Sequence, residues 1–243
     1  MNEVAPTGVL RIGINLGNPV IAQRAPAGGE PLGVGAALGR AFAKQLGLRY
    51  QFRTWETAGK MADAAQRDEW DIAFLAVDPA RASDIDFTAP YVHIEGTCMV
   101  RQDSRAMSLA DLDRPGNRIA VALKSAYDLF LSREVRQATL IREPDSDAAV
   151  DAFLSRQLEA VAGIRQPLEA TARAEPALRV LAQSFMTIRQ AAGVPKGRTR
   201  AHRLLAQFIE DSKRDGLVAR ALADSGVGPV TIAPPATDPD LSR

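Results

Sequence analysis

The sequence predicts an α/β protein made of two β-α-β lobes joined by two extended crossover segments. Short apolar runs typical of buried strands alternate with segments of helical periodicity, which favours largely parallel sheets. This alternation occurs in two separate runs along the chain, without visible sequence repetition. Two long extended segments, residues 91–100 and 185–192, flank the second run and are the expected crossovers. We therefore expect residues 1–96 with 190–243 to form a discontinuous first lobe, and residues 97–189 to form the second.

The composition excludes several classes of protein. The chain has 243 residues, of which 46% are hydrophobic and 24% are charged, and its net charge of +1 indicates neither nucleic acid nor an anionic membrane surface as partner. Its one cysteine, Cys98, excludes a disulfide framework and a multi-cysteine metal site, and it is expected to be a small buried side chain. No apolar run approaches the length of a membrane span. We expect a monomer without metal or cofactor.

The first run of elements begins with a strand over residues 10–15, which ends in a turn rich in Gly, Asn and Pro. An amphipathic helix over residues 31–46, a strand over 49–53 and a helix over 58–66 follow. The run Ile72–Val77 is continuously apolar, as in a strand buried on both faces, and Asp78-Pro79 ends it. The glycines within residues 33–39 imitate a dinucleotide fingerprint, but their spacing is wrong and a polar loop precedes them.

The second run repeats this pattern after a short helix at residues 108–112. Ser125 is a plausible N-cap for the helix that starts there. The expected strands are residues 118–123, 138–141, 158–164 and 178–181, and the expected helices 124–132, 146–154 and 166–174. Two helices, 199–215 and 216–224, return the chain to the first lobe, with Leu204, Leu205, Phe208 and Ile209 inward. Residues 229–243, with three prolines, are expected to be a loose tail.

Arg81 stands a few residues past the end of the strand at Ile72–Val77, and Ile85-Asp-Phe-Thr and Pro90-Tyr91 follow it. Ligands of open α/β sheets bind just beyond the carboxyl ends of strands. A guanidinium there is well placed to bind a carboxylate through two parallel hydrogen bonds. The alternative is a solvated surface arginine.

The order and spacing of this strand, Arg81, Ile85-Asp-Phe-Thr and Pro90-Tyr91 resemble the first-lobe signature of type 2 periplasmic solute-binding proteins. The closest group is the polar-amino-acid-binding family of ABC importers, the family 3 extracellular solute-binding proteins. Gly8-Val-Leu-Arg-Ile-Gly-Ile14 looks like that family's first strand, and the resemblance extends to about Gly226. It implies a two-lobed periplasmic-binding-protein-like type II fold, in which Arg81 holds the carboxylate of a ligand between lobes that close by hinge motion.

From the first lobe we expect Asn15, Asn18, Trp55 and Arg81 to contact the ligand. The two asparagines end the first strand and offer amide donors and acceptors, although turn formation would also explain them. Trp55 is placed to cover an apolar or cationic part of the ligand, and core packing is its alternative.

From the second lobe we expect Lys124, Ser125, Tyr127 and Arg165 to contact the ligand. Ser125 is either a cap only or a cap that also touches a carboxylate. The family usually has glycine where Lys124 stands, and an acid for the ligand's ammonium group near Arg165. These departures favour a ligand without a cationic side chain. Two alternatives remain: Arg165 points at solvent or pairs with Glu169, and Glu56 or Glu95 serves an ammonium group.

The resemblance implies a solute-binding protein without catalytic residues, which captures an amino acid or another small carboxylate for an ABC permease. One rival is an enzyme similar to cyclohexadienyl dehydratases, which share this scaffold and need an acid in the cleft. Another is a sensor or interaction domain. The start Met-Asn-Glu-Val-Ala-Pro has no signal peptide, so we expect a periplasmic protein whose export signal was replaced, or a cytoplasmic one.

Overall fold

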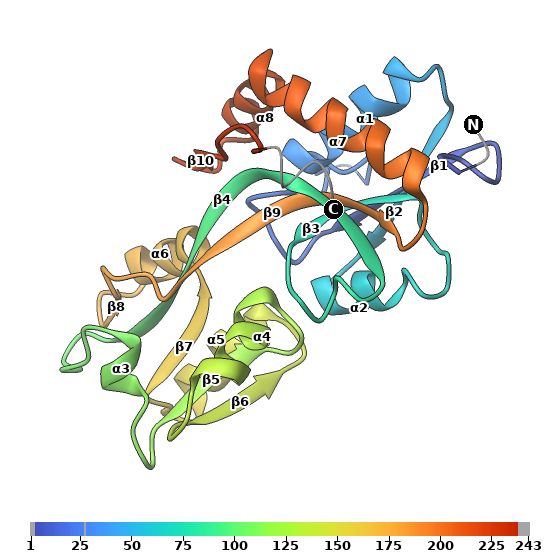
Figure 1. Cartoon of the computed structure of the whole chain (residues 1–243). Coiled ribbons are helices and arrows are strands. Elements are labelled where there is room, and N and C mark those ends of the chain that lie inside the picture. The colour runs from blue at the N-terminus through green and yellow to red at the C-terminus, as the bar shows by residue number, and fades with distance from the viewer. Residues whose placement is uncertain (1–2, 27, 238–243) are drawn as a thin grey trace. The chain divides into compact units, whose positions relative to one another are not determined.

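The computed structural model describes residues 3–26 and 28–237, so residues 238–243 of the expected tail and residue 27 of the loop before the first helix lie outside the description. The chain divides into two compact units. Unit 1 is Met1–His93 with Arg189–Arg243, and unit 2 is Ile94–Ile188. Helices and strands alternate in both units, so the predicted α/β fold class is confirmed (Figure 1).

The sheet of unit 1 is built on three parallel strands. They are β1 (Leu10–Asn15), β2 (Tyr50–Trp55) and β3 (Ile72–Ala76), in the order β2-β1-β3. Strand β9 (Met186–Pro195) pairs antiparallel with β3 and lies next to β4 (Ile85–Arg101). Strands β4 and β9 are long enough to belong to both units, so the chain passes twice from one unit to the other.

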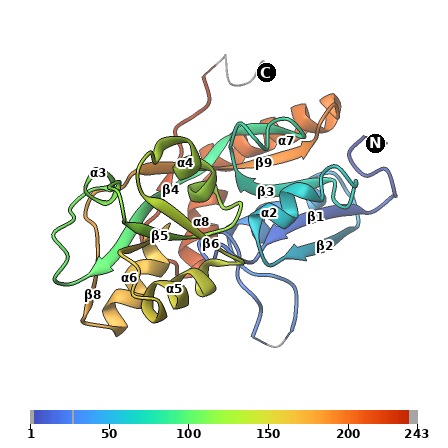
Figure 2. The ribbon, with the colours of Figure 1, turned by 90° about the horizontal axis from the view of Figure 1, so that it is seen from below.

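Helices cover both faces of these parallel strands. Helices α1 (Val34–Gln45), α7 (Thr199–Arg214) and α8 (Leu217–Ser225) lie on one face, and α2 (Ala58–Asp63) lies on the other (Figures 1 and 2). Helix α1 packs closely because Gly39 has no side chain: a Cβ there would lie 2.8 Å from a methyl carbon of Ile12. Packing on β1 therefore accounts for this glycine of the apparent dinucleotide fingerprint.

A buried carboxylate joins distant segments of unit 1. Asp71, which precedes β3, is fully buried and receives hydrogen bonds from Arg11 of β1 and from Arg198 at the start of α7. Asp68 extends the same network at the surface, where its side chain is 59% exposed. The network ties the N-terminal strand to the C-terminal helix, which stabilises a unit made of two separate chain segments.

The sheet of unit 2 has the order β4-β7-β5-β6. Strands β5 (Arg118–Ala122), β6 (Thr139–Glu143) and β7 (Ala160–Ile164) are parallel, and β8 (Leu178–Val180) pairs with β4. Its helices are α3 (Leu109–Leu112), α4 (Ala126–Glu134), α5 (Ser146–Ser155) and α6 (Arg165–Ala174). Phe153 of α5 is at the centre of an apolar core with Met99, Val161 and Leu168.

Some local predictions are wrong. Leu204 is 37% exposed, because the buried stripe of α7 is formed by Leu205, Phe208 and Ile209, and Leu204 lies at its edge. The expected tail contains a short strand, β10 (Thr231–Ile232), which pairs with β4 at Val92 and His93.

Cys98 is buried as predicted, and burial raises the pKa of its thiol to about 12. Within the described part of the chain, no helix has the length and apolar character to cross a membrane.

Candidate functional site

The carboxyl ends of the parallel strands in unit 1 bring several predicted site residues to one edge of the sheet. Asn15 ends β1 and Trp55 ends β2, and the two residues are direct partners in the parallel register. Arg81 lies shortly after the end of β3, which is the neighbour of β1 on its other side. The edge therefore carries an amide, an indole and a guanidinium from three adjacent strands, in the position where open α/β sheets bind ligands.

Asn15 and Asn18 are almost completely buried, and their side chains shape the turn after β1. The Oδ1 atom of Asn15 accepts a hydrogen bond of 3.0 Å from the backbone N–H of Gly17, and Oδ1 of Asn18 accepts one of 3.2 Å from Val20. These are the bonds of Asx-turns, so turn chemistry explains the oxygen atoms of both side chains. Gly17 is required at this point, since a Cβ there would meet the carbonyl oxygen of Glu56 at 2.4 Å.

Trp55 is half-buried and packs against the cluster that contains Met61 and Trp70. Core packing therefore accounts for the buried part of its side chain. Its neighbour Glu56, a candidate partner for a ligand's ammonium group, forms an ion pair with Arg24. Both side chains of that pair are largely exposed, so the pair is weak and solvent competes with it.

Arg81 is the most deeply buried cation among the predicted site residues, with 4% of its surface exposed. One terminal N–H donates a hydrogen bond of 2.9 Å to the carbonyl oxygen of Ala76, the last residue of β3. Burial lowers the pKa of the guanidinium to about 10, against the opposing effect of the carboxylates of Asp78 and Asp63. Arg81 is thus still charged at neutral pH, in surroundings where a charge is costly. The simple alternative of a solvated surface arginine does not fit this burial.

The corresponding edge of unit 2 carries Lys124 and Ser125, which follow β5. Ser125 is the N-cap of α4, as predicted: its hydroxyl oxygen accepts a hydrogen bond of 3.0 Å from the backbone N–H of Asp128. Lys124 has φ = 56°, in the left-handed region that favours glycine. The lysine therefore occupies a backbone conformation that glycine adopts at lower energetic cost.

Sequence analysis missed Asp128, which holds this turn together. Its carboxylate is 3% exposed and accepts a hydrogen bond of 2.8 Å from the backbone N–H of Lys124 and one of 2.9 Å from Nε of Arg142. The pattern Ser125-x-x-Asp128 would have indicated it, because a serine followed three residues later by an acid is typical of a helix start.

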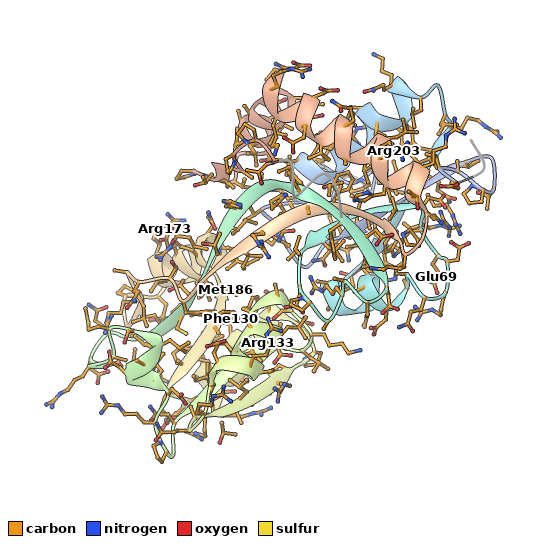
Figure 3. All side chains as sticks on the ribbon, in the orientation of Figure 1. Glu69, Phe130, Arg133, Arg173, Met186 and Arg203 are labelled. Atoms are coloured by element: carbon orange, nitrogen blue, oxygen red, sulfur yellow. The ribbon has the colours of Figure 1, made fainter. Side chains whose placement is uncertain are left out.

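Tyr127 is buried, and its hydroxyl lies 2.9 Å from the hydroxyl of Ser146 at the start of α5. Burial raises the pKa of this phenol, so it remains a neutral hydrogen-bonding group. Further along α4, the ring of Phe130 stacks on Phe185, with centroids 5.8 Å apart. In Figure 3, Phe130 is labelled, and so is Met186, which follows Phe185 in the sequence. Helix α4 is thus anchored within unit 2 by both Tyr127 and Phe130.

Arg165 follows β7, the parallel neighbour of β5, and so lies at the same edge as Lys124. Its Nε donates to Glu95, and its terminal nitrogens donate to the carbonyl oxygens of Leu181 at 3.2 Å and Ala182 at 2.9 Å. Oε1 of Glu169 lies 3.5 Å from a terminal nitrogen of Arg165. This is the pair that one of the alternatives for Arg165 predicted. These contacts engage the guanidinium within unit 2 and balance its charge.

The structure therefore forms two groups of predicted site residues, one in each unit. Asn15, Asn18, Trp55 and Arg81 lie at the carboxyl edge of unit 1. Lys124, Ser125 and Arg165 lie at the carboxyl edge of unit 2, with Tyr127 behind them. Donors and cations predominate in both groups, which suits an anionic group such as a carboxylate. Among the described residues, no group of His, Cys, Asp and Glu side chains could hold a metal ion.

Comparisons with known proteins identify the family and the fold of the chain. The model of the bacterial extracellular solute-binding proteins, family 3, matches residues 10–224. No curated protein matches the chain.

Solved structures of similar fold include an amino acid ABC transporter substrate-binding protein from Streptococcus pneumoniae bound to L-arginine. Its TM-score is 0.79 at 17% identity, over 93% of this chain and 97% of that one. A histidine kinase sensor domain matches with a TM-score of 0.78 at 20% identity, over 93% of this chain and 98% of that one. An ancestral amino-acid-binding protein, described as a precursor of cyclohexadienyl dehydratase, matches at 0.77 and 21% identity, over 92% and 97% of the two chains. At these identities the likeness establishes the fold.

Proposed function

Because the chain belongs to the bacterial extracellular solute-binding proteins of family 3, we propose that it captures an amino acid or another small carboxylate and delivers it to an ABC permease. The protein would have no chemistry of its own. Its function would be to bind a solute reversibly outside the cytoplasm.

The observation that carries this proposal is the buried guanidinium of Arg81 at the carboxyl edge of unit 1. Burial disfavours the charge of this guanidinium, and the carboxylate of a ligand would stabilise it through charge-assisted hydrogen bonds. This arrangement favours ligands that carry a carboxylate over neutral ones. Asn15, Asn18 and Trp55 would complete the contacts from unit 1.

Unit 2 would contribute Lys124, Ser125, Tyr127 and Arg165 to the same ligand. A ligand that is held by both units drives them together, since the bound state is stabilised only when both sets of contacts form. The chain passes between the units in β4 and β9, so the segments at residues 91–100 and 185–192 would be the hinges.

A thermal-shift screen with amino acids, dicarboxylates and aromatic acids tests the proposal. A ligand that binds only the native state stabilises it by about 2.7 kcal/mol at a hundredfold its dissociation constant. We expect at least one carboxylate to stabilise the wild-type protein and to lose this effect in Arg81→Ala, because the carboxylate would be left without its partner. Arg173 of α6 is exposed, and Arg173→Ala is the matched control that should respond like wild type. Equal stabilisation of all three proteins would refute the assignment of Arg81.

The rival function is a dehydratase on the same scaffold, because one structural relative is described as the precursor of such an enzyme. Incubation with prephenate or arogenate, followed by ultraviolet spectra, separates the two functions. We expect no turnover, whereas formation of an aromatic product would establish the rival.

A further inference from the structure

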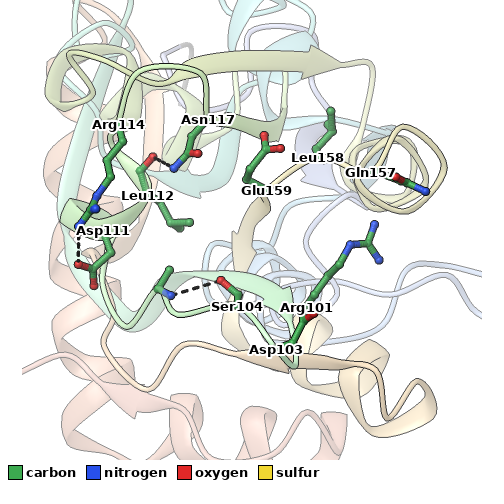
Figure 4. A pocket seen from close by; sticks show the side chains of 11 residues that line it. Arg101, Asp103, Ser104, Asp111, Leu112, Arg114, Asn117, Gln157, Leu158 and Glu159 are labelled. Carbon is green, nitrogen blue, oxygen red and sulfur yellow. Dashed lines mark hydrogen bonds and ion pairs between the residues drawn. The ribbon is translucent and has the colours of Figure 1, made fainter.

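Unit 2 has a second concave site at the edge opposite to Lys124 and Ser125. A cavity of about 400 Å³ opens where β5 and β7 begin and β4 ends (Figure 4). This volume is within the range of about 300–1,000 Å³ that is usual for small-molecule sites. All residues that line it, from Arg101 to Glu159, belong to unit 2, so the cavity is formed within one unit.

Most charges of this cavity are balanced within the protein. Asp111 pairs with Arg114 at 3.5 Å, and Glu159 pairs with Arg118 at 2.9 Å and also accepts from its backbone N–H. Glu159 and Arg118 link the starts of β7 and β5, whereas the pair of Asp111 and Arg114 is exposed, and Asp111 is held mainly by hydrogen bonds from Met107 and Ser108. These contacts leave little capacity on either carboxylate for a ligand.

Arg101 and Asp103 are different, because neither takes part in an ion pair among the described residues. The guanidinium of Arg101 lies over the ring of Phe153 at 5.2 Å, and the one hydrogen bond that its side chain makes within the described structure is a long one, 3.4 Å, to the carbonyl oxygen of Phe153. Figure 4 shows Arg101 on the side of the cavity where Gln157 lies. One cation and one anion thus line the same cavity, and each keeps most of its hydrogen-bonding capacity.

The rest of the lining divides into polar and apolar parts. The side chains of Ser104 and Asn117 use one polar atom each within the protein: Oγ of Ser104 accepts from the backbone N–H of Ala106, and Nδ2 of Asn117 donates to the carbonyl oxygen of Leu112. The hydroxyl proton of Ser104 and Oδ1 of Asn117 can therefore serve a ligand. Ala106, Leu112 and Leu158 are the apolar residues of the lining, and neighbouring residues bury most of their surface.

We propose that this cavity is a second ligand site, for a small zwitterion with an apolar side chain, of the class of the aliphatic amino acids. Arg101 binds the carboxylate, Asp103 binds the ammonium group, and Leu112 and Leu158 contact the side chain. The site lies at the amino edge of the parallel strands of unit 2, whereas Lys124, Ser125 and Arg165 lie at the carboxyl edge. It is therefore separate from the site of the proposed function, and its occupancy does not depend on Arg81.

Nuclear magnetic resonance of the full chain tests the second site with L-leucine as the probe. The side-chain amides of Asn117 and Gln157 and the backbone amide of Ser104 serve as reporters. Millimolar L-leucine should shift these signals to saturation in the wild type and equally in Arg81→Ala. If the proposed function fails, the two proteins still report on this cavity. Absence of any shift at the three reporters would overturn the proposal.

Two variants test the roles of the charges. Arg101→Gln should weaken leucine binding at least about tenfold, because the carboxylate loses a charged bidentate partner. Asp103 is exposed, so Asp103→Asn should fold normally, weaken leucine several-fold and leave the weaker binding of N-acetyl-L-leucine unchanged. Arg173→Gln, on the exposed surface of α6, is the control for Arg101→Gln and should bind like wild type. Equal affinities of leucine, N-acetyl-L-leucine and L-leucinamide would overturn the assignment of both charges.

Discussion

Arg165 donates a hydrogen bond from Nε to the carboxylate of Glu95 within unit 2. The side chain of Arg165 is 18% exposed and that of Glu95 is 53% exposed, so the arginine is shielded while its partner faces solvent. Because the carboxylate of Glu95 compensates the charge of Arg165, Arg165 by itself does not favour an anionic ligand. Arg81 and Lys124 are the other cations among the predicted site residues.

The pair predicts opposite effects for its two partners on ligand selectivity. Glu95→Gln leaves Arg165 with only the longer contact to Glu169 and should raise the affinity for acidic ligands, by about tenfold relative to arginine or lysine. Arg165→Gln leaves Glu95 alone and should favour cationic ligands. Calorimetric titration with glutamate and arginine measures both effects. If neither single variant changes the ratio of the two affinities, Arg165 is not near the ligand.

The burial of Arg81 predicts that the affinity for a carboxylate depends on pH differently when position 81 carries arginine or lysine. Burial lowers the pKa of the guanidinium from 12.5 to about 10, so Arg81 stays protonated, and carboxylate binding should not change between pH 6 and 9 through this group. A lysine starts from about 10.4, and the same burial would lower its pKa towards the range of the measurement. In Arg81→Lys the cation is present at low pH and is lost as the pH rises through this lowered pKa.

The measurement compares the affinity of a carboxylate ligand without an amine at pH 6 and pH 9 in both proteins. Wild type should show no change, and Arg81→Lys should lose about tenfold. Identical pH profiles would mean that Arg81 is not the carboxylate's partner.

The proposed hinges predict a change in size. Ligand that is held by both units should decrease the radius of gyration in small-angle scattering, because the units close on it. Arg81→Ala at the same ligand concentration should keep the radius of the ligand-free protein. An unchanged radius in wild type under saturating ligand would contradict closure.

Local sequence patterns predicted most elements, because each depends on near neighbours in the chain. Strand β1 over Leu10–Asn15 and the cap at Ser125 follow from apolar runs and from hydrogen bonding within one turn. Contacts between distant residues could not be predicted in this way. Glu95 and Arg165 are 70 residues apart in sequence, and Arg198 and Asp71 are 127 apart, so no local pattern links them. For the candidate site, the strand ends indicated the positions, and only the structure gave the partners of each side chain.

The buried network of unit 1 predicts a large difference between two neighbouring acids. Asp71→Asn removes the buried carboxylate that Arg11 and Arg198 share and leaves them only the exposed Asp68, which should cost about 3–5 kcal/mol of the free energy of unfolding. Asp68 pairs with the same two arginines but is exposed, so Asp68→Asn is the matched control and should cost less than about 1 kcal/mol. Urea denaturation measures both. Equal losses would show that burial of the carboxylate does not determine its contribution.

The conformation and charge of Lys124 predict that it lowers the stability of the ligand-free protein and raises the affinity for acidic ligands. Its φ of 56° strains any residue with a Cβ, so Lys124→Gly should stabilise the ligand-free protein by about 0.5–1 kcal/mol. The variant also removes a positive charge from the carboxyl edge of unit 2, and the affinity for an acidic ligand should fall by about tenfold. A lysine that is retained in a glycine conformation is consistent with a binding role that outweighs the strain.

Gln157 has φ = 50° in the same unit and lies at its opposite edge, so Gln157→Gly is the matched control. It should give a similar gain in stability without changing the affinity for the acidic ligand that depends on Arg81. Thermal unfolding and calorimetric titration of both variants separate strain from binding. If Lys124→Gly stabilises the protein and binds the acidic ligand as tightly as wild type, Lys124 does not contact the ligand, and Arg81 alone determines the preference for acids.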